Sequence, residues 1–141
     1  MAKTLQQKVV SALSKADLTL SCAESCTGGL IAKRITDVSG ASAVFHGGVV
    51  SYVNAVKQNV LGVSARDLEQ YGAVSAPVGR QMASGAARLL GTDLAVSTTG
   101  VAGPNPDDHG NAVGTVYVSL SAQGKTWCYL CHFDGNRAQV R

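Results

Sequence analysis

The spacing of apolar residues along the chain predicts several amphipathic helices. Leu5, Val9 and Leu13 recur every four residues, which places them on one face of a first helix. A longer helix is expected to begin at Ala76 and Pro77, because proline fits the first turn of a helix. Its buried face is expected to hold Val78, Met82, Ala86 and Leu89, and shorter helices are expected at 27–38, from Asn54 to near Gly62, and at 64–71 behind an N-cap at Ser64.

Short apolar runs between these helices predict buried strands at 18–22, 43–52 and 93–98. Two further strands, at 113–122 and 125–133, flank Gln123-Gly124 and predict a β-hairpin. Because strands alternate with helices before this hairpin, we predict an α/β fold, a three-layer α/β/α sandwich over a mixed, mostly parallel sheet. Residues 1–141 are expected to form a single domain of this kind.

The composition is that of a folded globular domain, and it narrows the function. Hydrophobic residues make up 45% of the 141 residues and charged residues 15%, which excludes a disordered chain and a coiled coil. The sequence shows no apolar run long enough to cross a membrane and no apolar leader, so we expect a cytoplasmic protein with four reduced cysteines. The net charge of +3 comes from scattered cations, which argues against nucleic-acid binding and suits a small anionic substrate.

Three segments rich in glycine or hydroxyl residues lie where predicted strands end. They span residues 23–29, 52–57 and 98–103. In open α/β sheets, ligands bind in the crevice beyond the carboxyl ends of the strands. We therefore expect the three segments to converge on one crevice.

Ser25 lies in the first of these segments, Ala-Glu-Ser-Cys-Thr-Gly-Gly, between a predicted strand and a predicted helix. The free N–H groups of a helix start can hold an oxyanion, so a serine at this position is suited to nucleophilic catalysis. Serine is also a common N-cap, and from spacing alone both interpretations stand. Glu24 is expected to be a partner of the helix dipole.

Lys57 lies in the second segment, behind an expected N-cap at Asn54. A lysine in the first turn of a helix is disfavoured by the helix dipole, and burial would lower its pKa further. A lysine tuned in this way can act as a general base, with Tyr52 orienting the proton. The alternative is a solvated surface lysine beside a tyrosine at the rim.

The third segment reads Thr-Thr-Gly-Val-Ala-Gly-Pro at 98–104. Its Gly-x-x-Gly loop would let backbone N–H groups approach a phosphate or carboxylate. The spacing matches neither a P-loop nor a dinucleotide fingerprint, and a plain turn is the alternative.

The cysteines allow two further readings, a zinc site and a thiol nucleophile. Cys128 and Cys131 lie in a predicted strand, where residues three apart face opposite sides. We therefore expect buried thiols and no metal. Cys26 differs, because a helix start lowers the pKa of a thiol, and it is the alternative nucleophile to Ser25.

Several runs occur together and in a fixed order: residues 23–29, Tyr52-x-Asn54-x-x-Lys57, Gly72-Ala-Val-Ser75, Gly100-x-Ala-Gly-Pro104, Val113-Gly-Thr-Val116 and Gly135-x-Arg137. In this order they resemble the CinA C-terminal domain family, whose active members are nicotinamide mononucleotide deamidases of the PncC type. The resemblance covers nearly the whole chain.

The resemblance implies an amidohydrolase that converts nicotinamide mononucleotide and water to nicotinate mononucleotide and ammonia, as part of pyridine nucleotide recycling. It implies no metal or other cofactor. Carried onto matching positions, Ser25 is the nucleophile, Lys57 the base and Tyr52 its partner. The substrate-binding set that we expect comprises Cys26, Thr27, Gly28, Gly29, Asn54, Thr99, Gly100, Val101, Ala102, Gly103 and Arg137, with the glycine loop and Arg137 on the 5′-phosphate.

The sequence departs from the family pattern at two places. Asn136 stands where the family has aspartate, which is expected to weaken a pairing with Arg137. Relatives continue into a further helix, so we expect the domain to lack or truncate a closing C-terminal helix. Family members commonly self-associate, and a homo-oligomer is expected. The alternative function is a catalytically silent nucleotide-binding or regulatory domain of the same fold.

Overall fold

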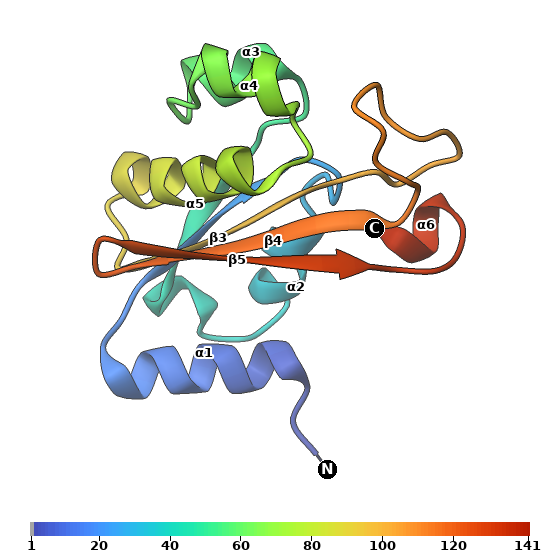
Figure 1. Cartoon of the computed structure of the whole chain (residues 1–141). Coiled ribbons are helices and arrows are strands. Elements are labelled where there is room, and N and C mark those ends of the chain that lie inside the picture. The colour runs from blue at the N-terminus through green and yellow to red at the C-terminus, as the bar shows by residue number, and fades with distance from the viewer. Residues whose placement is uncertain (1) are drawn as a thin grey trace.

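The computed structural model describes residues 2–141 and builds them around one five-stranded sheet (Figure 1). The strands are β1 (Leu20–Glu24), β2 (Phe45–Val50), β3 (Leu94–Gly100), β4 (Thr115–Ala122) and β5 (Lys125–His132). Their order across the sheet is β2-β1-β3-β4-β5, with β1 parallel to β2 and β3, and β4 antiparallel to β3 and β5. The predicted mixed sheet is confirmed, with two parallel and two antiparallel pairings.

Helices cover both faces of this sheet. The helices α1 (Leu5–Ala16) and α2 (Leu30–Thr36) lie on one side, and α3 (Asn54–Asn59), α4 (Ala65–Tyr71) and α5 (Ala76–Leu90) lie on the other (Figure 1). A 3₁₀ turn, η1 (Ala41–Ala43), precedes β2, and α6 (Arg137–Val140) follows β5. The three predicted layers are therefore present.

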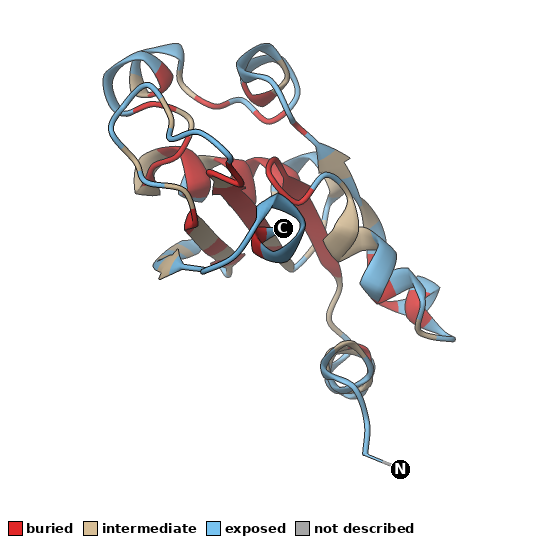
Figure 2. Ribbon diagram, turned by 90° about the vertical axis from the view of Figure 1, so that its right-hand side faces the viewer, coloured by how far each residue is buried: buried red, intermediate tan, exposed pale blue. Residues whose placement is uncertain are grey.

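Two apolar cores hold the layers together, one on each side of the sheet. On the α5 side, Val78, Met82 and Ala86 pack against Leu61 and Ala95. On the opposite side, Val10 of α1 and Ile35 of α2 join residues of β1 and β2. Figure 2 shows that buried residues concentrate in the central strands, while α1 is exposed over most of its surface.

One predicted member of the α5 core face is wrong. Leu89 is 51% exposed. None of the residues 87–90 is buried, so the buried face of α5 ends at Ala86. Helical periodicity gives the direction of a side chain but not the point where the neighbouring layer ends.

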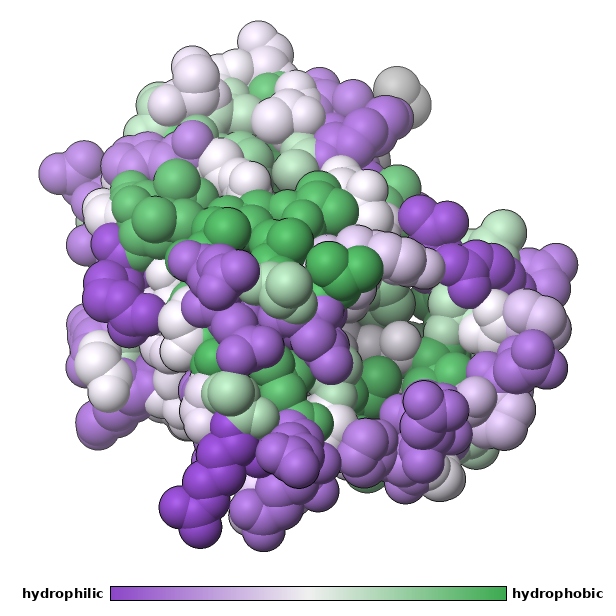
Figure 3. Space-filling model, turned by 90° about the horizontal axis from the view of Figure 1, so that it is seen from above, coloured by the Kyte–Doolittle hydropathy of each residue, from purple (hydrophilic) through white to green (hydrophobic). Residues whose placement is uncertain are grey.

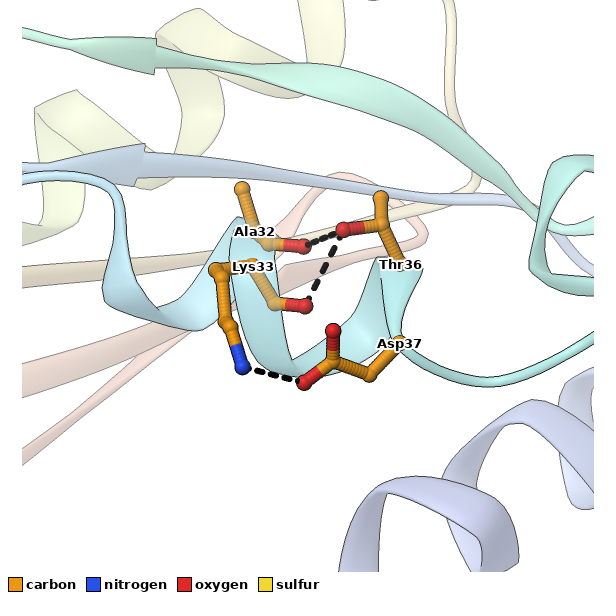
Figure 4. Close-up of polar contacts among 4 residues, drawn as sticks. All are labelled: Ala32, Lys33, Thr36 and Asp37. Atoms are coloured by element: carbon orange, nitrogen blue, oxygen red, sulfur yellow. Dashed lines mark hydrogen bonds and ion pairs between the residues drawn. The ribbon is translucent and has the colours of Figure 1, made fainter.

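The turns explain where the elements end. The hairpin between β4 and β5 is closed by Gln123 at φ 54° and Gly124 at φ 76°, the pair of positive φ angles that a two-residue type I′ hairpin requires. At the end of α2, the Thr36 hydroxyl donates to the carbonyl oxygens of Ala32 and Lys33, and Lys33 forms an exposed ion pair with Asp37 (Figure 4). An exposed pair of this kind adds little stability, so α2 depends mainly on its packing and its N-terminal bonds.

The contact between α5 and the segment after α3 sets how close α3 lies to the sheet. Gly85 is buried in the middle of α5, and a Cβ atom there would overlap the carbonyl oxygen of Leu61. Arg88 donates to the same carbonyl oxygen at 3.2 Å. The absence of a side chain at Gly85 therefore lets the backbone after α3 rest directly on α5.

We expect Gly85→Ala to destabilise the protein by about 1–3 kcal/mol, because the new methyl group meets backbone that has no room to move. The free energy of unfolding in urea measures this effect. Ser84→Ala, at the half-buried neighbouring position, is the matched control and should change that value by less than about 0.5 kcal/mol. A stabilising Gly85→Ala, as helix propensity alone would give, would contradict the packing argument.

Candidate active site

The three segments predicted to converge do meet at one cavity. It has a volume of about 260 Å³ and lies beyond the carboxyl ends of β1, β2 and β3. Its lining residues are Ser25, Cys26, Tyr52, Asn54, Lys57, Ala73, Val74, Thr99, Gly100, Ala102 and Arg137. A serine, a lysine and an arginine thus share one small, mostly polar space.

Ser25 is placed by a turn and not by a helix start, so that part of the prediction is wrong. Its N–H donates to the carbonyl oxygen of Thr98 at 2.9 Å, and its own carbonyl oxygen accepts from Gly28 N–H at 3.2 Å. Gly28 and Gly29, at φ 60° and 105°, delay α2 until Leu30. These left-handed conformations are accessible to glycine and costly for other residues. Ser25 is therefore also not the N-cap of α2.

The N-terminus of α2 is occupied by Glu24 instead. The carboxylate of Glu24 accepts from the N–H groups of Ile31 at 2.9 Å and Ala32 at 3.1 Å. The expectation that Glu24 is the partner of the helix dipole is confirmed. The N–H groups in the first turn of α2 are consequently bonded to Glu24 and are not available to Ser25.

Lys57 is buried, which reverses the usual pattern of a surface helix. Its side chain is 1% exposed, whereas Val53 and Val60, at the two ends of the same helix, are 55% and 42% exposed. Seen from above, apolar residues gather on the outside of the molecule where α3 lies (Figure 3). Charged residues are almost never fully buried without a partner, so the burial of Lys57 beside exposed valines points to a specific role for its amine.

The amine of Lys57 is held beside the hydroxyl of Ser25. The Nζ atom lies 3.0 Å from Ser25 Oγ and donates to the carbonyl oxygens of Ser51 at 2.7 Å and Tyr52 at 3.4 Å. Within residues 2–141 the only ion pair joins Lys33 and Asp37, so no carboxylate balances the charge of Lys57. The surroundings of Lys57 therefore suit a neutral amine better than an ammonium ion.

Burial lowers the pKa of Lys57 from 10.5 to about 8. The predicted direction is confirmed, but the expected helix contribution is wrong. The N-cap of α3 is Val53 and not Asn54, and Lys57 lies in the last turn of this six-residue helix. Desolvation of the ammonium group is thus the physical cause of the lowered pKa.

Tyr52 and Arg137 meet at the rim of the cavity. Arg137, on α6, donates to the Tyr52 hydroxyl at 2.9 Å and to the carbonyl oxygen of Gly103 at 2.7 Å. Tyr52 contacts Lys57 through its backbone carbonyl and not through its hydroxyl. Asn136 caps α6 by accepting from Gln139 N–H, so its role lies in the helix and not in a pairing with Arg137.

The predicted substrate-binding residues divide into two groups. Cys26, Asn54, Thr99, Gly100, Ala102 and Arg137 line the cavity, whereas Thr27, Gly28, Gly29, Val101 and Gly103 do not. The Thr99 hydroxyl donates to the carbonyl oxygen of Ala73 at 2.8 Å, and the Thr27 hydroxyl is bonded to Glu24. Thr27 therefore supports the turn behind the cavity wall and not the wall itself.

Sequence reasoning missed four contributors to the site. Ala73 and Val74 complete the cavity wall, the Ser51 carbonyl holds Lys57, and Arg141 donates to the Cys26 carbonyl oxygen at 2.9 Å. Only the Gly72-Ala-Val-Ser75 run carried a signal for any of them. Backbone carbonyls and an arginine far away in sequence leave no local pattern.

Cys26 lines the cavity as a buried thiol. It is 6% exposed, and burial raises the pKa of its thiol above the ordinary value. The expectation of a lowered pKa is wrong, because no helix starts at this residue.

Within residues 2–141, no cluster of three or more His, Cys, Asp or Glu side chains could hold a metal ion. None of the helices in these residues is long and apolar enough to span a bilayer.

Comparisons with known proteins identify relatives of this chain. The chain is 50% identical over 139 residues to a CinA-like protein of Geotalea daltonii, covering 99% of this chain and 34% of the relative. It is 46% identical over 138 residues to a CinA-like protein of Geobacter sulfurreducens, covering 98% of this chain and 33% of that relative. The chain thus spans about a third of the length of these curated relatives.

Solved structures show the same fold. A competence damage-inducible protein from Klebsiella pneumoniae matches with a TM-score of 0.95 and 34% identity, over 96% of this chain and 84% of that one. A competence/damage inducible protein from Agrobacterium tumefaciens matches with a TM-score of 0.92 and 36% identity, over 96% and 84% of the two chains. The model of the CinA C-terminal domain family matches residues 2–141, and the chain belongs to that family.

Proposed function

We propose that this chain is an amidohydrolase that deamidates nicotinamide mononucleotide to nicotinate mononucleotide and ammonia, with Ser25 as nucleophile and Lys57 as base. The observation that carries the proposal is the buried amine of Lys57, 3.0 Å from Ser25 Oγ at the wall of a small polar cavity. A neutral amine within hydrogen-bond distance of a hydroxyl is the arrangement that activates a serine. We place the reaction in cytoplasmic recycling of pyridine nucleotides, with a homo-oligomer as its working form.

The reaction proceeds in two halves. Neutral Lys57 takes the proton of Ser25 as Oγ attacks the carboxamide carbon, and the C=O electrons move to the oxygen. When the tetrahedral intermediate collapses, the C–N bond breaks and Lys57 gives its proton to the leaving nitrogen, which departs as ammonia. Water, deprotonated by Lys57, then attacks the acyl-serine and releases the carboxylate product with Ser25 restored.

Two backbone N–H groups are candidates for binding the oxyanion. Neither Cys26 N–H nor Thr27 N–H donates to a backbone carbonyl within residues 2–141, whereas Gly28 N–H is bonded to Ser25. Donors fixed in a turn beside the nucleophile need no reorganisation when charge develops on the oxygen. Because Cys26 lines the cavity and Thr27 does not, we assign the oxyanion to Cys26 N–H and exclude Gly28 from that role.

The rim of the cavity suits the anionic end of the substrate. Arg137 uses one nitrogen on Tyr52 and another on Gly103, and a guanidinium has five N–H donors in all. The remaining donors can bind a 5′-phosphate alongside the loop at 100–103. Tyr52 then acts on the substrate side through Arg137, and holds Lys57 through its carbonyl oxygen.

We expect Ser25→Ala and Lys57→Ala each to lower ammonia release from nicotinamide mononucleotide by at least about 1,000-fold, because each removes half of the nucleophile–base pair. Cys26→Ala should stay well above both variants, since burial raises the pKa of its thiol, and Cys128→Ala, outside the cavity, is the control that should stay close to wild type. Ammonia is measured directly, and substrate affinity of Ser25→Ala by calorimetry. An active Ser25→Ala with an inactive Cys26→Ala would identify the thiol as the nucleophile. A wild-type protein that binds the nucleotide but releases no ammonia would contradict the enzymatic proposal.

The rate should depend on the protonation of Lys57. Only the neutral amine accepts a proton, so kcat/KM is expected to rise with pH, to half of its maximum at pH about 8, and to level off above that value. The pH–rate profile measures this midpoint. A rate that falls as pH increases through this range would contradict a neutral lysine base.

Unfolding gives an independent measure of the same protonation. The folded pKa of about 8 lies below the 10.5 of an unperturbed lysine, so the unfolded chain binds the proton more strongly. The contribution of Lys57 to stability should therefore increase with pH between these two values, and Lys57→Met should lack that increase. Urea unfolding of both proteins at about pH 7 and about pH 10 tests this, and parallel stability profiles would contradict it.

A further inference from the structure

Glu24 is a fully buried carboxylate directly before Ser25. Its side chain is 0% exposed, and it has no cationic partner, because the only ion pair within residues 2–141 joins Lys33 and Asp37. A buried carboxylate without a cation is costly unless hydrogen bonds satisfy its oxygens. The burial of Glu24 therefore depends on its hydrogen bonds.

The hydrogen bonds that satisfy Glu24 come from the turn that carries Ser25 and from the helix after it. One carboxylate oxygen accepts from the Thr27 hydroxyl at 2.5 Å, Gly29 N–H at 3.2 Å and Ile31 N–H at 2.9 Å. The other accepts from Ala32 N–H at 3.1 Å, with the Cys22 thiol at 3.6 Å. The turn at 25–29 is thus folded around the side chain of the residue that precedes it.

Glu24 also joins this turn to the two neighbouring strands. The Thr27 hydroxyl that binds the carboxylate lies 2.8 Å from the Thr98 hydroxyl at the end of β3. The backbone carbonyl of Glu24 accepts from Ser51 N–H at 2.8 Å, and the carbonyl of Ser51 in turn holds Lys57 Nζ. The side chain of Glu24 therefore fixes the serine, while its backbone is connected to the segment that fixes the lysine.

We propose that Glu24 is the positioning residue that keeps Ser25 Oγ within hydrogen-bond distance of Lys57 Nζ. This inference rests on the proposed function, in which Ser25 is the nucleophile. Glu24 touches neither Ser25 Oγ nor the cavity, so it acts through the shape of the turn. An isosteric amide turns at least one of its acceptors into a donor that faces an N–H or O–H group, which leaves the turn without one of its anchors.

The test is Glu24→Gln, with Glu69→Gln as the matched control. Glu69 is the only other glutamate in the chain, and its side chain is exposed, so the control makes the same chemical change outside the site. The readout is the rate at which a fluorophosphonate labels Ser25, at a pH above 8 and at a temperature where each variant is folded by circular dichroism. We expect Glu24→Gln to label at least about tenfold more slowly than wild type, because displacing a reacting atom by about an ångström costs up to about 100-fold in rate.

A purely structural role predicts a different result. In that case Glu24→Gln melts earlier but labels as fast as wild type and Glu69→Gln, and this outcome overturns the inference. With the nucleotide as substrate, the positioning role predicts a lower kcat with a KM within about threefold of wild type, because the phosphate-binding rim is untouched. The midpoint of the pH–rate profile should not move, since the burial of Lys57 is unchanged.

Failure of the proposed function is distinguishable from failure of this inference. A wild-type protein that reacts with fluorophosphonate but not with the nucleotide contradicts the proposed substrate and leaves the labelling test of Glu24 in force. Should the wild-type protein react with neither, the distance between Ser25 Oγ and Lys57 Nζ in crystal structures of wild type and Glu24→Gln decides the question. Lengthening of that distance in the variant supports the inference, and retention at 3.0 Å overturns it.

Discussion

The burial of one amine without a carboxylate partner is the constraint on which the site depends. Lys57 is held by backbone carbonyl oxygens and by the Ser25 hydroxyl, which are neutral groups. Neutral acceptors do not offset the cost of burying an ammonium ion, so the pKa falls to about 8 and the amine can be free of its proton at moderate pH.

A second buried ionisable group lies one residue from the nucleophile, and the fold keeps it apart from the first. Glu24 and Lys57 are both buried, yet neither is within ion-pair distance of the other. An ion pair between them would favour the ammonium form and remove the base. The N-terminus of α2 and the Thr27 hydroxyl satisfy Glu24 instead. Each group is therefore stabilised in the form that its role requires, the carboxylate as an acceptor and the amine as a base.

Short-range patterns in the sequence predicted those elements whose formation depends on neighbouring residues. The periodicity of α1 and α5, the Gln123-Gly124 hairpin and the convergence of three strand ends all follow from nearest neighbours and from one rule about parallel sheets. The burial of Lys57 and the turn at Ser25 were beyond this reach. The turn depends on two left-handed glycines wrapped around the Glu24 side chain, and the Tyr52–Arg137 contact joins residues 85 positions apart. The prediction that α2 begins at residue 27 put the N-terminus of the helix beside Ser25. In the structure α2 begins at Leu30, and Glu24 accepts from the N–H group of Ile31 in its first turn.

The choice between an alcohol and a thiol nucleophile follows from which group the base contacts. Thiols are intrinsically better nucleophiles, but only as thiolates, and burial disfavours the charged form of Cys26 by raising the pKa of its thiol. An alcohol is not ionised in advance at any moderate pH, and its proton must leave as the new bond forms. That requirement is met by a neutral base in direct contact, which Ser25 has in Lys57. Burial in this cavity disfavours a thiolate at Cys26. It therefore favours the hydroxyl of Ser25, because proton transfer to Lys57 during attack requires no anion formed in advance.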